Sequence, residues 1–415
     1  MKELILSTYD IEGGAAKDAF RLHKAMLKLG VDSKMLVQYK SSDEYSIISP
    51  GTRIERIKAK SRTILDNLPL NFYKGYKNLP WHISWVSSGI IKKIYKLNPD
   101  IINLNWICNG LINIREISKL PCKVIWTIHD MWSFTGGCHY SGDCTRYLKK
   151  CGKCPQLGSN KELDLSRWVW NQKTRYWMNL NLTVVSPSNW LANIAKKSTI
   201  FKNKRIEVIP YAIDTNIFKP ISKLEARKIL NLPINKKIVI FGSLDATSDK
   251  RKGFYLLKPA LNKIANSSAN EDLELAIFGS SKPNNPVDLG LKTHFFGILK
   301  DDISLATIYS AADVFLAPSI EDNLPNTILE SLTCGTPVVA FNIGGNPDMI
   351  KHKTNGYLVK PFEVEDFVEG IKWVLENKEN ICNLSNNARR FALEKFSDIK
   401  IAEKYLKLYQ EIIKL

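Results

Sequence analysis

The sequence contains no apolar run that approaches the roughly 20 residues a helix needs to cross a bilayer. Its first apolar segment meets Asp10 before the core of a secretion signal could form, so we expect no leader peptide. The sequence therefore predicts a cytoplasmic protein, a compartment in which cysteine thiols normally stay reduced.

Acidic residues are few relative to basic ones: 41 Asp and Glu stand against 59 Lys and Arg, which gives a formal net charge of +18. Such a field attracts both nucleic acids and anionic membranes. The lysines are spread along the chain among many Ile and Asn residues, and this disfavours a nucleic-acid-binding face. Scattered solvated charge and a membrane-facing patch both remain open.

A chain of 415 residues, 44% hydrophobic and 24% charged, has room for two globular domains with substantial cores. Short apolar runs alternate with segments of helical periodicity, a pattern typical of α/β folds with parallel sheets. The clearest expected strands are Lys2–Thr8, Lys123–Ile128, Lys237–Phe241, Leu273–Phe278 and Val338–Phe341.

The most informative stretch spans residues 318–348, PSIEDNLPNTILESLTCGTPVVAFNIGGNPD. A buried strand should precede it, and Pro325 suits the first turn of a helix that we expect to end at Cys334, before Gly335. A helix that begins at the carboxyl end of a parallel strand directs its free N–H groups and its dipole toward a bound anion. The stretch therefore predicts a phosphate-binding site.

Acidic residues flank the start of this helix. Glu321 and Asp322 precede it, and Glu330 follows Asp322 after seven intervening residues. One carboxylate can therefore reach the mouth of the site while another points at a ligand lying along the first turns.

Other strand ends carry residues suited to the same ligand. Gly13 and Gly14 follow the first strand and allow a close approach of the backbone. His129 follows the strand Lys123–Ile128, and the turn DKRKG, residues 249–253, places Arg251 and Lys252 between a strand and a helix. The carboxyl ends of parallel strands share one edge of a sheet, so these residues should lie at a ligand crevice.

Taken together, these motifs resemble the family 4 glycosyltransferases, retaining nucleotide-sugar-dependent enzymes of the GT-B fold. Within that family the similarity is to a colanic-acid or surface-polysaccharide branch with a cysteine-rich loop. The resemblance implies that Asp322 contacts the donor sugar, that Glu330 binds the ribose and that Lys252 binds the diphosphate. It also implies that the main chain at Ile298 contacts the base and that His129 lies over the sugar near the anomeric carbon.

The sequence departs from the family pattern at several positions. Asp322 stands where the first acid is usually Glu, so neighbouring Glu321 is an alternative for that role. Pro325 occupies a position where many members have Gly and lacks an N–H, which leaves the amides of Asn326 and Thr327 to serve the donor. Ser243 replaces a family arginine, for which Arg251 is the substitute. The Gly13-Gly14 loop is expected opposite the donor diphosphate.

The resemblance implies an α/β fold of two doubly wound Rossmann-like domains that face a central cleft. We expect an N-terminal acceptor-side domain at residues 1–205, a nucleotide-sugar-binding domain at 206–397 and a final helix at 398–415 that packs back on the first domain. No clear Asp-x-Asp pair is present, so no cofactor is expected for catalysis.

The expected donor is a UDP-sugar or a GDP-sugar, and the expected acceptor is a growing glycan or lipid-linked saccharide of the bacterial surface. A lipid carrier would bring the enzyme to the inner face of the membrane as a peripheral protein. Two alternatives remain: a GT-B epimerase or phosphorylase, and a basic zinc module that binds nucleic acid. The latter is less favoured, and no nucleic-acid partner is expected.

Four cysteines lie within seventeen positions, at Cys138, Cys144, Cys151 and Cys154. Four thiolates so close in sequence fit a structural zinc site, and the last pair has the spacing of a zinc knuckle. Free thiols and an iron–sulfur cluster are the alternatives, with His139 as an outside candidate ligand. Such a loop would stiffen the wall of the site rather than perform chemistry.

Periodicity fades between Ser41 and Trp85, where we expect loop with short helices. Aromatic residues alternate there with lysines, which suits either an acceptor-side surface for a phosphate-bearing lipid or a helical layer anchored by aromatics. The aromatic residues in question are Tyr73, Tyr76, Trp81 and Trp85.

Overall fold

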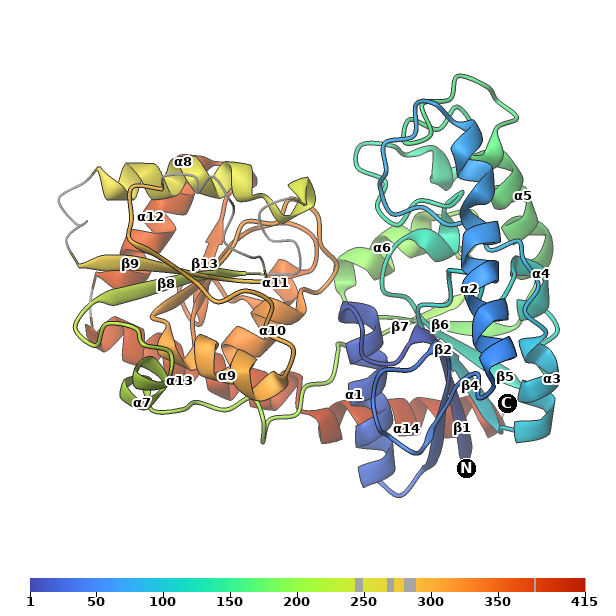
Figure 1. Ribbon diagram of the computed structural model, residues 1–415, viewed down its shortest axis with the longest axis horizontal. Coiled ribbons are helices and arrows are strands. Elements are labelled where there is room, and N and C mark those ends of the chain that lie inside the picture. Colours follow the sequence, from blue (N-terminus) through green and yellow to red (C-terminus); the bar gives the residue numbers. More distant parts are fainter. Residues whose placement is uncertain (243–248, 267–271, 280–288, 377, 415) are drawn as a thin grey trace. The chain divides into compact units, whose positions relative to one another are not determined.

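The computed structural model describes residues 1–242, 249–266, 272–279, 289–376 and 378–414. These residues divide into two compact units, one formed by Met1–Ala212 with Asp398–Leu415 and the other by Ile213–Ser397. Each unit is a parallel sheet covered by helices (Figure 1). The fold class predicted from the sequence is confirmed. Ser243, which stands where the family has an arginine, lies outside the described residues.

The sheet of the first unit has seven strands in the order β3-β2-β1-β4-β5-β6-β7, all parallel. Its chain order reverses between β1 and β4, the kind of switch point at which α/β sheets bind ligands. The strands are β1 (Lys2–Tyr9), β2 (Asp32–Tyr39), β3 (Ile47–Ile48), β4 (Ile101–Leu104), β5 (Lys123–Thr127), β6 (Leu182–Ser186) and β7 (Arg205–Val208).

Seven α-helices and three short 3-10 turns surround this sheet among the described residues. Ser188 caps α6, since its hydroxyl accepts a hydrogen bond from the Leu191 amide. The helices are α1 (Gly14–Lys28), α2 (Arg53–Asn67), α3 (Ile90–Leu97), α4 (Ile114–Ile117), α5 (Leu165–Trp177), α6 (Asn189–Lys197) and α14 (Asp398–Lys414), with η1 (Leu68–Phe72), η2 (Trp132–Phe134) and η3 (Arg146–Leu148).

The sheet of the second unit has six parallel strands in the order β10-β9-β8-β11-β12-β13, with its switch point between β8 and β11. The strands are β8 (Lys237–Gly242), β9 (Leu273–Phe278), β10 (Thr293–Phe295), β11 (Val314–Ala317), β12 (Val338–Phe341) and β13 (Gly356–Val359). Its helices are α7 (Lys223–Ile229), α8 (Phe254–Ala265), α9 (Asp302–Ala311), α10 (Asn326–Thr333), α11 (Asn346–Met349), α12 (Val364–Leu375) and α13 (Lys378–Lys395), with the turn η4 (Lys250–Lys252).

The region between Ser41 and Trp85 differs from the expectation of loop with short helices. It contains α2, a helix of 15 residues that begins with a capping box between Thr52 and Glu55. Trp81 is 2% exposed and packs in the core, so its role is to anchor this layer. Trp85, by contrast, is 45% exposed.

No helix among the described residues is both long enough and apolar enough to span a bilayer.

The last helix, α14, packs on α1 and the sheet of the first unit through buried tyrosines (Figure 1). The Tyr409 hydroxyl donates to a Glu3 carboxylate oxygen over 2.6 Å and accepts from the Asn103 amide over 2.8 Å. The Ser33 hydroxyl donates to the other Glu3 oxygen, also over 2.6 Å. Burial raises the pKa of Glu3 to about 7, although both hydrogen bonds oppose that shift.

This raised pKa makes the stability of the first unit depend on pH. The unfolded Glu3 carboxyl ionises near pH 4.5, whereas the folded one keeps its proton until about pH 7. Stability contributed by Glu3 is therefore present below pH 4.5 and falls as the pH rises through this window, by up to ~3 kcal/mol. In Glu3→Gln that loss should disappear, so thermal denaturation at pH 5 and pH 8 should show a smaller decline than in wild type.

The exposed Glu403 of α14 provides the matched control, because Glu403→Gln should follow the wild-type pH profile. Parallel profiles for wild type and Glu3→Gln would show that the Glu3 carboxyl does not titrate in this window.

Candidate functional site

The switch point of the second unit brings together three of the residues expected to bind a donor. Lys252 and Arg251 follow β8, and Asp322 follows β11. The Lys252 Nζ lies 2.9 Å from Asp322 Oδ2, and Arg251 Nη1 lies 3.4 Å from the same oxygen. Asp322 is 8% exposed, and burial alone would raise the pKa of its carboxyl. The two cations outweigh burial and hold that pKa below its usual value, so Asp322 is ionised.

Two glycines fix the loop that carries Asp322. At Gly253 a Cβ atom would lie 1.8 Å from the Pro318 carbonyl oxygen, and at Gly344 it would lie 1.9 Å from the Asp322 carbonyl oxygen. Both glycines have positive φ, 72° and 53°. Only residues without a side chain can approach the loop so closely. The main chain adds hydrogen bonds from the Ile320 amide to the Arg251 carbonyl and from Gly345 to Asp322.

The helix expected at Pro325 begins one residue later. Pro325 has φ −62° and ψ 121°, which is extended, and it caps α10. Its carbonyl accepts the first helical hydrogen bonds, from the Ile328 and Leu329 amides. The amides of Asn326 and Thr327 therefore precede the helical hydrogen-bond pattern, at the position suggested for donor binding.

Glu330 lies on the buried side of α10. It is 3% exposed and accepts a hydrogen bond of 3.2 Å from the Tyr309 hydroxyl. No contact joins it to Asp322 among those of the described residues. Glu321 is partly exposed, and its main-chain carbonyl accepts from Arg251 Nη1 over 3.1 Å. Ile298 lies beyond β10, next to Gly297, and is 57% exposed.

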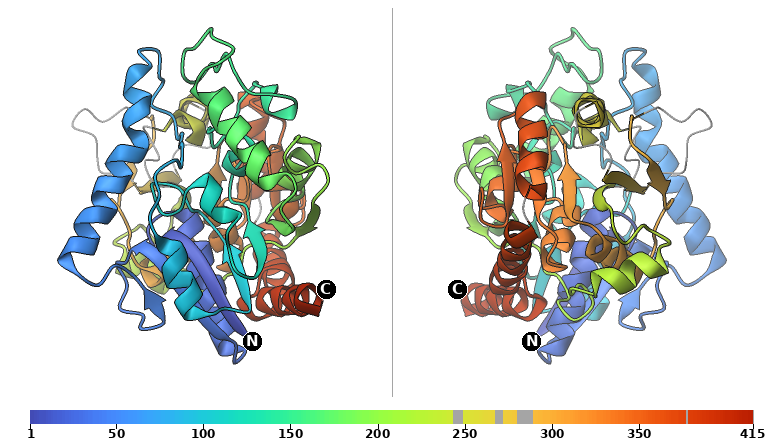
Figure 2. Two further views of the ribbon diagram at one scale, coloured as in Figure 1. Left: turned by 90° about the vertical axis from the view of Figure 1, so that its right-hand side faces the viewer. Right: turned by 90° about the vertical axis from the view of Figure 1, so that its left-hand side faces the viewer.

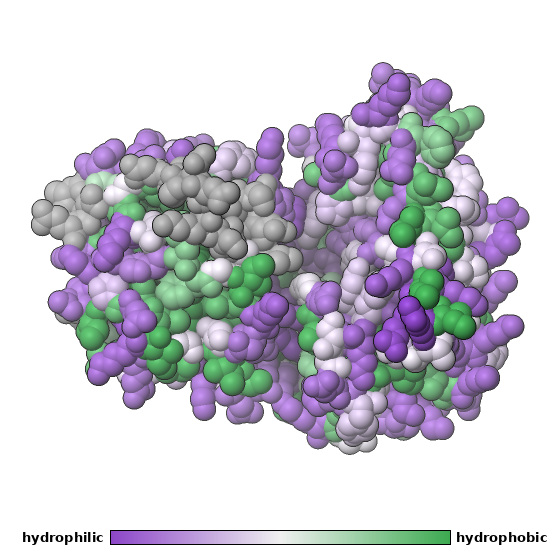
Figure 3. All heavy atoms as spheres, in the orientation of Figure 1, coloured by the Kyte–Doolittle hydropathy of each residue, from purple (hydrophilic) through white to green (hydrophobic). Residues whose placement is uncertain are grey.

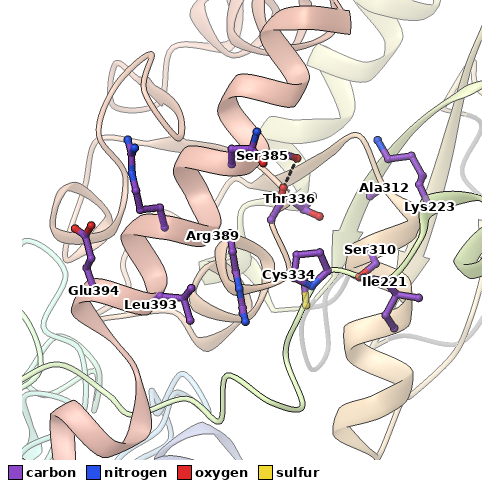
Figure 4. Close-up of a pocket in the computed structure, with 14 residues that line it drawn as sticks. Ile221, Lys223, Ser310, Ala312, Cys334, Thr336, Ser385, Arg389, Leu393 and Glu394 are labelled. Carbon is purple, nitrogen blue, oxygen red and sulfur yellow. Dashed lines mark hydrogen bonds between the residues drawn. The ribbon is translucent and has the colours of Figure 1, made fainter.

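A cavity of about 390 Å³ lies elsewhere in the second unit, beside the carboxyl end of α10 (Figure 4). Arg389 of α13 lines it and donates to the carbonyls of Thr333 and Phe218 over 2.8 and 2.7 Å. These bonds cap α10 at the end opposite Asn326. The cavity is therefore a packing seam around α13 and does not contain the cluster of Arg251, Lys252 and Asp322.

In the first unit, His129 lies at the carboxyl end of β5 as expected, and it is held between two polar side chains. Its Nε2 is 3.0 Å from Asn105 Oδ1, its Nδ1 is 2.9 Å from the Tyr211 hydroxyl, and its ring stacks on Tyr211 at 5.3 Å. Burial lowers the pKa of His129 to about 4, against the opposing charge of Asp130. A neutral ring whose Nε2 faces a carbonyl oxygen carries its proton there and accepts from Tyr211 at Nδ1.

Gly13 and Gly14 begin α1 next to the same switch point. Gly13 has φ 87° and caps the helix without a side chain, and both glycines are exposed. The loop therefore presents main chain rather than side chains at the end of β1.

An aromatic surface at this switch point was not predicted from the sequence. Tyr9 ends β1, Tyr39 ends β2, and Trp106 follows β4; all three are partly exposed. Tyr9 stacks on Tyr39 at 5.2 Å and lies 6.1 Å from Trp106, between ring centroids. The available signal was the position of each ring at the end of a buried parallel strand. We call these three residues the aromatic wall.

A buried polar chain supports the aromatic wall from behind. Asp130 Oδ2 is 2.7 Å from His139 Nδ1, and His139 Nε2 is 2.7 Å from His82 Nδ1. The His82 ring meets Trp106 edge-on at 5.2 Å. Cys108 lies within 4.8 Å of both imidazoles, as in a metal site. Two nitrogens on one zinc ion would be about 3.3 Å apart, whereas the 2.7 Å separation here is that of a hydrogen bond between the two rings.

The zinc site predicted from the four cysteines is not supported. No group of three potential ligands among the described residues includes any of them, although zinc would bring all four sulfurs within about 4 Å of one another. Cys151 and Cys154 instead pack in the hydrophobic core, and burial raises the pKa of Cys151 to about 12. Burial also raises the pKa of the Cys138 and Cys154 thiols, which favours their protonated form. The zinc-dependent nucleic-acid alternative loses its basis with the zinc site.

Comparison with known proteins agrees with this arrangement. The family described as Glycosyltransferase Family 4 matches residues 12–217, and that described as Glycosyl transferases group 1 matches residues 235–377. The WcaC glycosyl transferase of colanic acid biosynthesis from Escherichia coli K12 is 23% identical over 97% of both chains. A Campylobacter jejuni N-acetylgalactosaminyltransferase acting on a diphospho-undecaprenol substrate is 28% identical over 55% of this chain and 59% of its own.

Solved structures share the fold over the whole chain. Sucrose-phosphate synthase from Thermosynechococcus elongatus covers 100% of both chains with a TM-score of 0.70 and 19% identity. Anabaena HepE, solved with UDP and glucose, covers 99% of both chains with a TM-score of 0.66 and 16% identity. The two family matches, the relative that spans the chain and the two Rossmann-like sheets lead to one conclusion: this protein is a glycosyltransferase of family 4, a retaining family of the GT-B fold.

Proposed function

We propose that the protein transfers a hexose-type sugar from UDP or GDP to a growing, lipid-linked glycan of the bacterial surface. Relatives that act on diphospho-undecaprenol substrates, and one named for colanic acid biosynthesis, support this acceptor class. HepE, which is similar in fold, binds UDP and glucose. The reaction would take place in the cytoplasm, at the inner face of the membrane.

The cluster of Arg251, Lys252 and Asp322 carries this proposal. When the bond between sugar and phosphate breaks, negative charge grows on the leaving diphosphate while the sugar becomes oxocarbenium-like. Cations already in place stabilise that charge without reorganisation at the moment of reaction. Asp322 holds Lys252 and Arg251 over one carboxylate oxygen, so both are oriented before the donor binds. The helix N-terminus at Asn326 and Thr327 adds main-chain donors.

His129 would act through its main chain or its neutral ring rather than as an acid. Its low pKa, about 4, leaves the ring uncharged at neutral pH. An uncharged ring can lie over an oxocarbenium-like sugar without repelling it. The aromatic wall in the same unit suits the acceptor, because sugar rings stack on the faces of Tyr and Trp.

A panel of nucleotide sugars tests the donor. Purified protein should hydrolyse one UDP-linked or GDP-linked hexose in preference to the others, and this activity should persist in EDTA because no metal is invoked. Activity that vanishes in EDTA and returns with manganese would contradict the metal-independent mechanism. Formation of an epimerised sugar, or cleavage that requires phosphate, would replace transfer with the corresponding alternative reaction.

Replacing Lys252 should affect turnover more than binding. In Lys252→Ala we expect kcat to fall by ~100-fold, while the donor Kd changes by less than about tenfold, because the charge of Lys252 matters most as the diphosphate departs. Lys250 is exposed and belongs to the same turn, so Lys250→Ala is the matched control and should keep wild-type kinetics. Equal losses in kcat and donor affinity for Lys252→Ala would mean that it binds ground state and transition state alike.

Substitutions of Glu330 and Asp322 should have different kinetic effects. Glu330→Gln should chiefly raise the donor KM, roughly tenfold, because a charged acceptor for the ribose hydroxyls becomes neutral. Asp322→Asn should change the preference among donor sugars. Steady-state kinetics on two donors that share a base but differ in sugar would measure both effects. Unchanged kinetics in both variants would remove these residues from the site.

A further inference from the structure

The helix α2 exposes apolar side chains instead of burying them. Residues 54, 57, 61, 64, 68 and 72 follow one another at intervals of three or four and so form one stripe along α2 and η1. Apart from Ser61, every member is a large apolar residue, and Leu65 widens the stripe. The exposed fractions are Ile54 65%, Ile57 55%, Ile64 68%, Leu65 45%, Leu68 45% and Phe72 82%. Apolar side chains are visible over α2 in Figure 3.

The inner face of α2 is polar and firmly attached to the first unit. Asp66 is fully buried and accepts from the amides of Ser84 and Trp85 over 3.2 and 2.9 Å. Thr63 donates to the Asn109 carbonyl over 2.9 Å, and Arg62 donates to the Gly110 carbonyl over 3.1 Å. These bonds fix the rotation of the helix about its axis. The apolar stripe is therefore held facing outward. The helix α2 lies at the edge of the unit in two further views (Figure 2).

Basic residues flank the stripe. Their exposed members are Arg53, Arg56, Lys58, Lys60, Lys74 and Lys77. The acidic residues of α2 are Glu55, which pairs with Lys93 at 2.8 Å, and Asp66, which is buried and so lies away from the stripe. The surface thus combines an apolar centre with a positive rim, within a chain of net charge +18.

We propose that α2 and η1 form a docking surface for an anionic phospholipid bilayer. An amphipathic segment of this composition lies in the plane of the interface, with its apolar side chains at the acyl boundary and its cations among the headgroup phosphates. This inference rests on the proposed function in one respect: a lipid-linked acceptor gives the docking surface a role, which is to bring the aromatic wall of the same unit to the membrane. The binding itself can be measured without any donor or acceptor.

Vesicle flotation with the full-length protein tests the apolar stripe. Wild type should float with vesicles that contain phosphatidylglycerol and should remain unbound with pure phosphatidylcholine. Ile57→Ser with Ile64→Ser should weaken partitioning at least ~10-fold, because two side chains lose their burial in the acyl region. The control is Tyr45→Ser with Leu163→Ser, two residues of the same unit that are 90% and 82% exposed but lie off α2. An equal loss in both pairs would overturn the proposal.

A second pair of substitutions tests the positive rim. Arg53→Gln with Lys60→Gln should weaken partitioning by about fivefold per cation removed, and the effect should shrink at high salt. Lys149→Gln with Lys150→Gln removes two exposed cations elsewhere in the unit and should bind like wild type. Equal binding of wild type to neutral and anionic vesicles would contradict the electrostatic part. A concentration-dependent dimer that the isoleucine variants abolish would assign the stripe to a second copy of the chain instead.

Activity assays separate this inference from the proposed function. The isoleucine variants should keep wild-type hydrolysis of the donor, and they should lose transfer only when the acceptor is embedded in vesicles. If wild type floats as expected but transfers no sugar, the acceptor proposal fails while the docking surface stands. If transfer to vesicle-borne acceptor is unchanged in variants that no longer float, the docking surface has no part in acceptor access.

Discussion

The close packing of two glycines against one loop is the constraint on which the charge cluster of the second unit depends. The loop after β11 passes so near Gly253 and Gly344 that any side chain there would overlap the main-chain oxygens of Pro318 and Asp322. Because the three segments are packed tightly together, Lys252 is held beside Asp322 and has little conformational freedom. Preorganisation of this kind makes a charge cluster useful in catalysis, since fixed charges need not rearrange as the leaving group forms.

The electrostatic balance of that cluster gives the acid a role among residues that we propose bind the donor diphosphate. Two neighbouring cations, Arg251 and Lys252, repel each other when the site is empty, and partly burying them carries a desolvation cost. Asp322 offsets both effects and remains ionised. A bound diphosphate would then take over part of the cations' interaction. In the first unit, by contrast, burial lowers the pKa of His129 and favours the neutral ring, although the Asp18 carboxylate lies 3.9 Å from its Nδ1.

The sequence predicted the sheet-forming elements, and the structure brings together Arg251, Lys252 and Asp322, whose role at a donor site remains a prediction. Buried parallel strands such as β12 are continuous apolar runs. The change from apolar to polar residues marks the end of such a strand, and the same change identifies the candidate ligand-binding residues. Elements without that contrast were harder to predict. Tyr9 ends one buried strand and Trp106 follows another, but an aromatic residue at such a position resembles a core residue. The zinc prediction, which the structure does not support, rested on spacing along the chain, and spacing alone does not determine how a loop orients its side chains.

The helix α2 escaped prediction because it reverses the usual amphipathic arrangement. Sequence periodicity locates a helix by assuming that its apolar face is the buried one. Here Asp66 accepts a hydrogen bond from the Trp85 amide, and Thr63 and Arg62 donate to main-chain carbonyls, so polar contacts hold the inner face. The capping box at Thr52 stabilises the first turn. The fold therefore does not need the outer isoleucines, and their exposure leaves them available to a bilayer. A helix anchored by polar groups and apolar on its outside keeps its structure in water and can still bind a membrane, which is what the proposed docking surface requires.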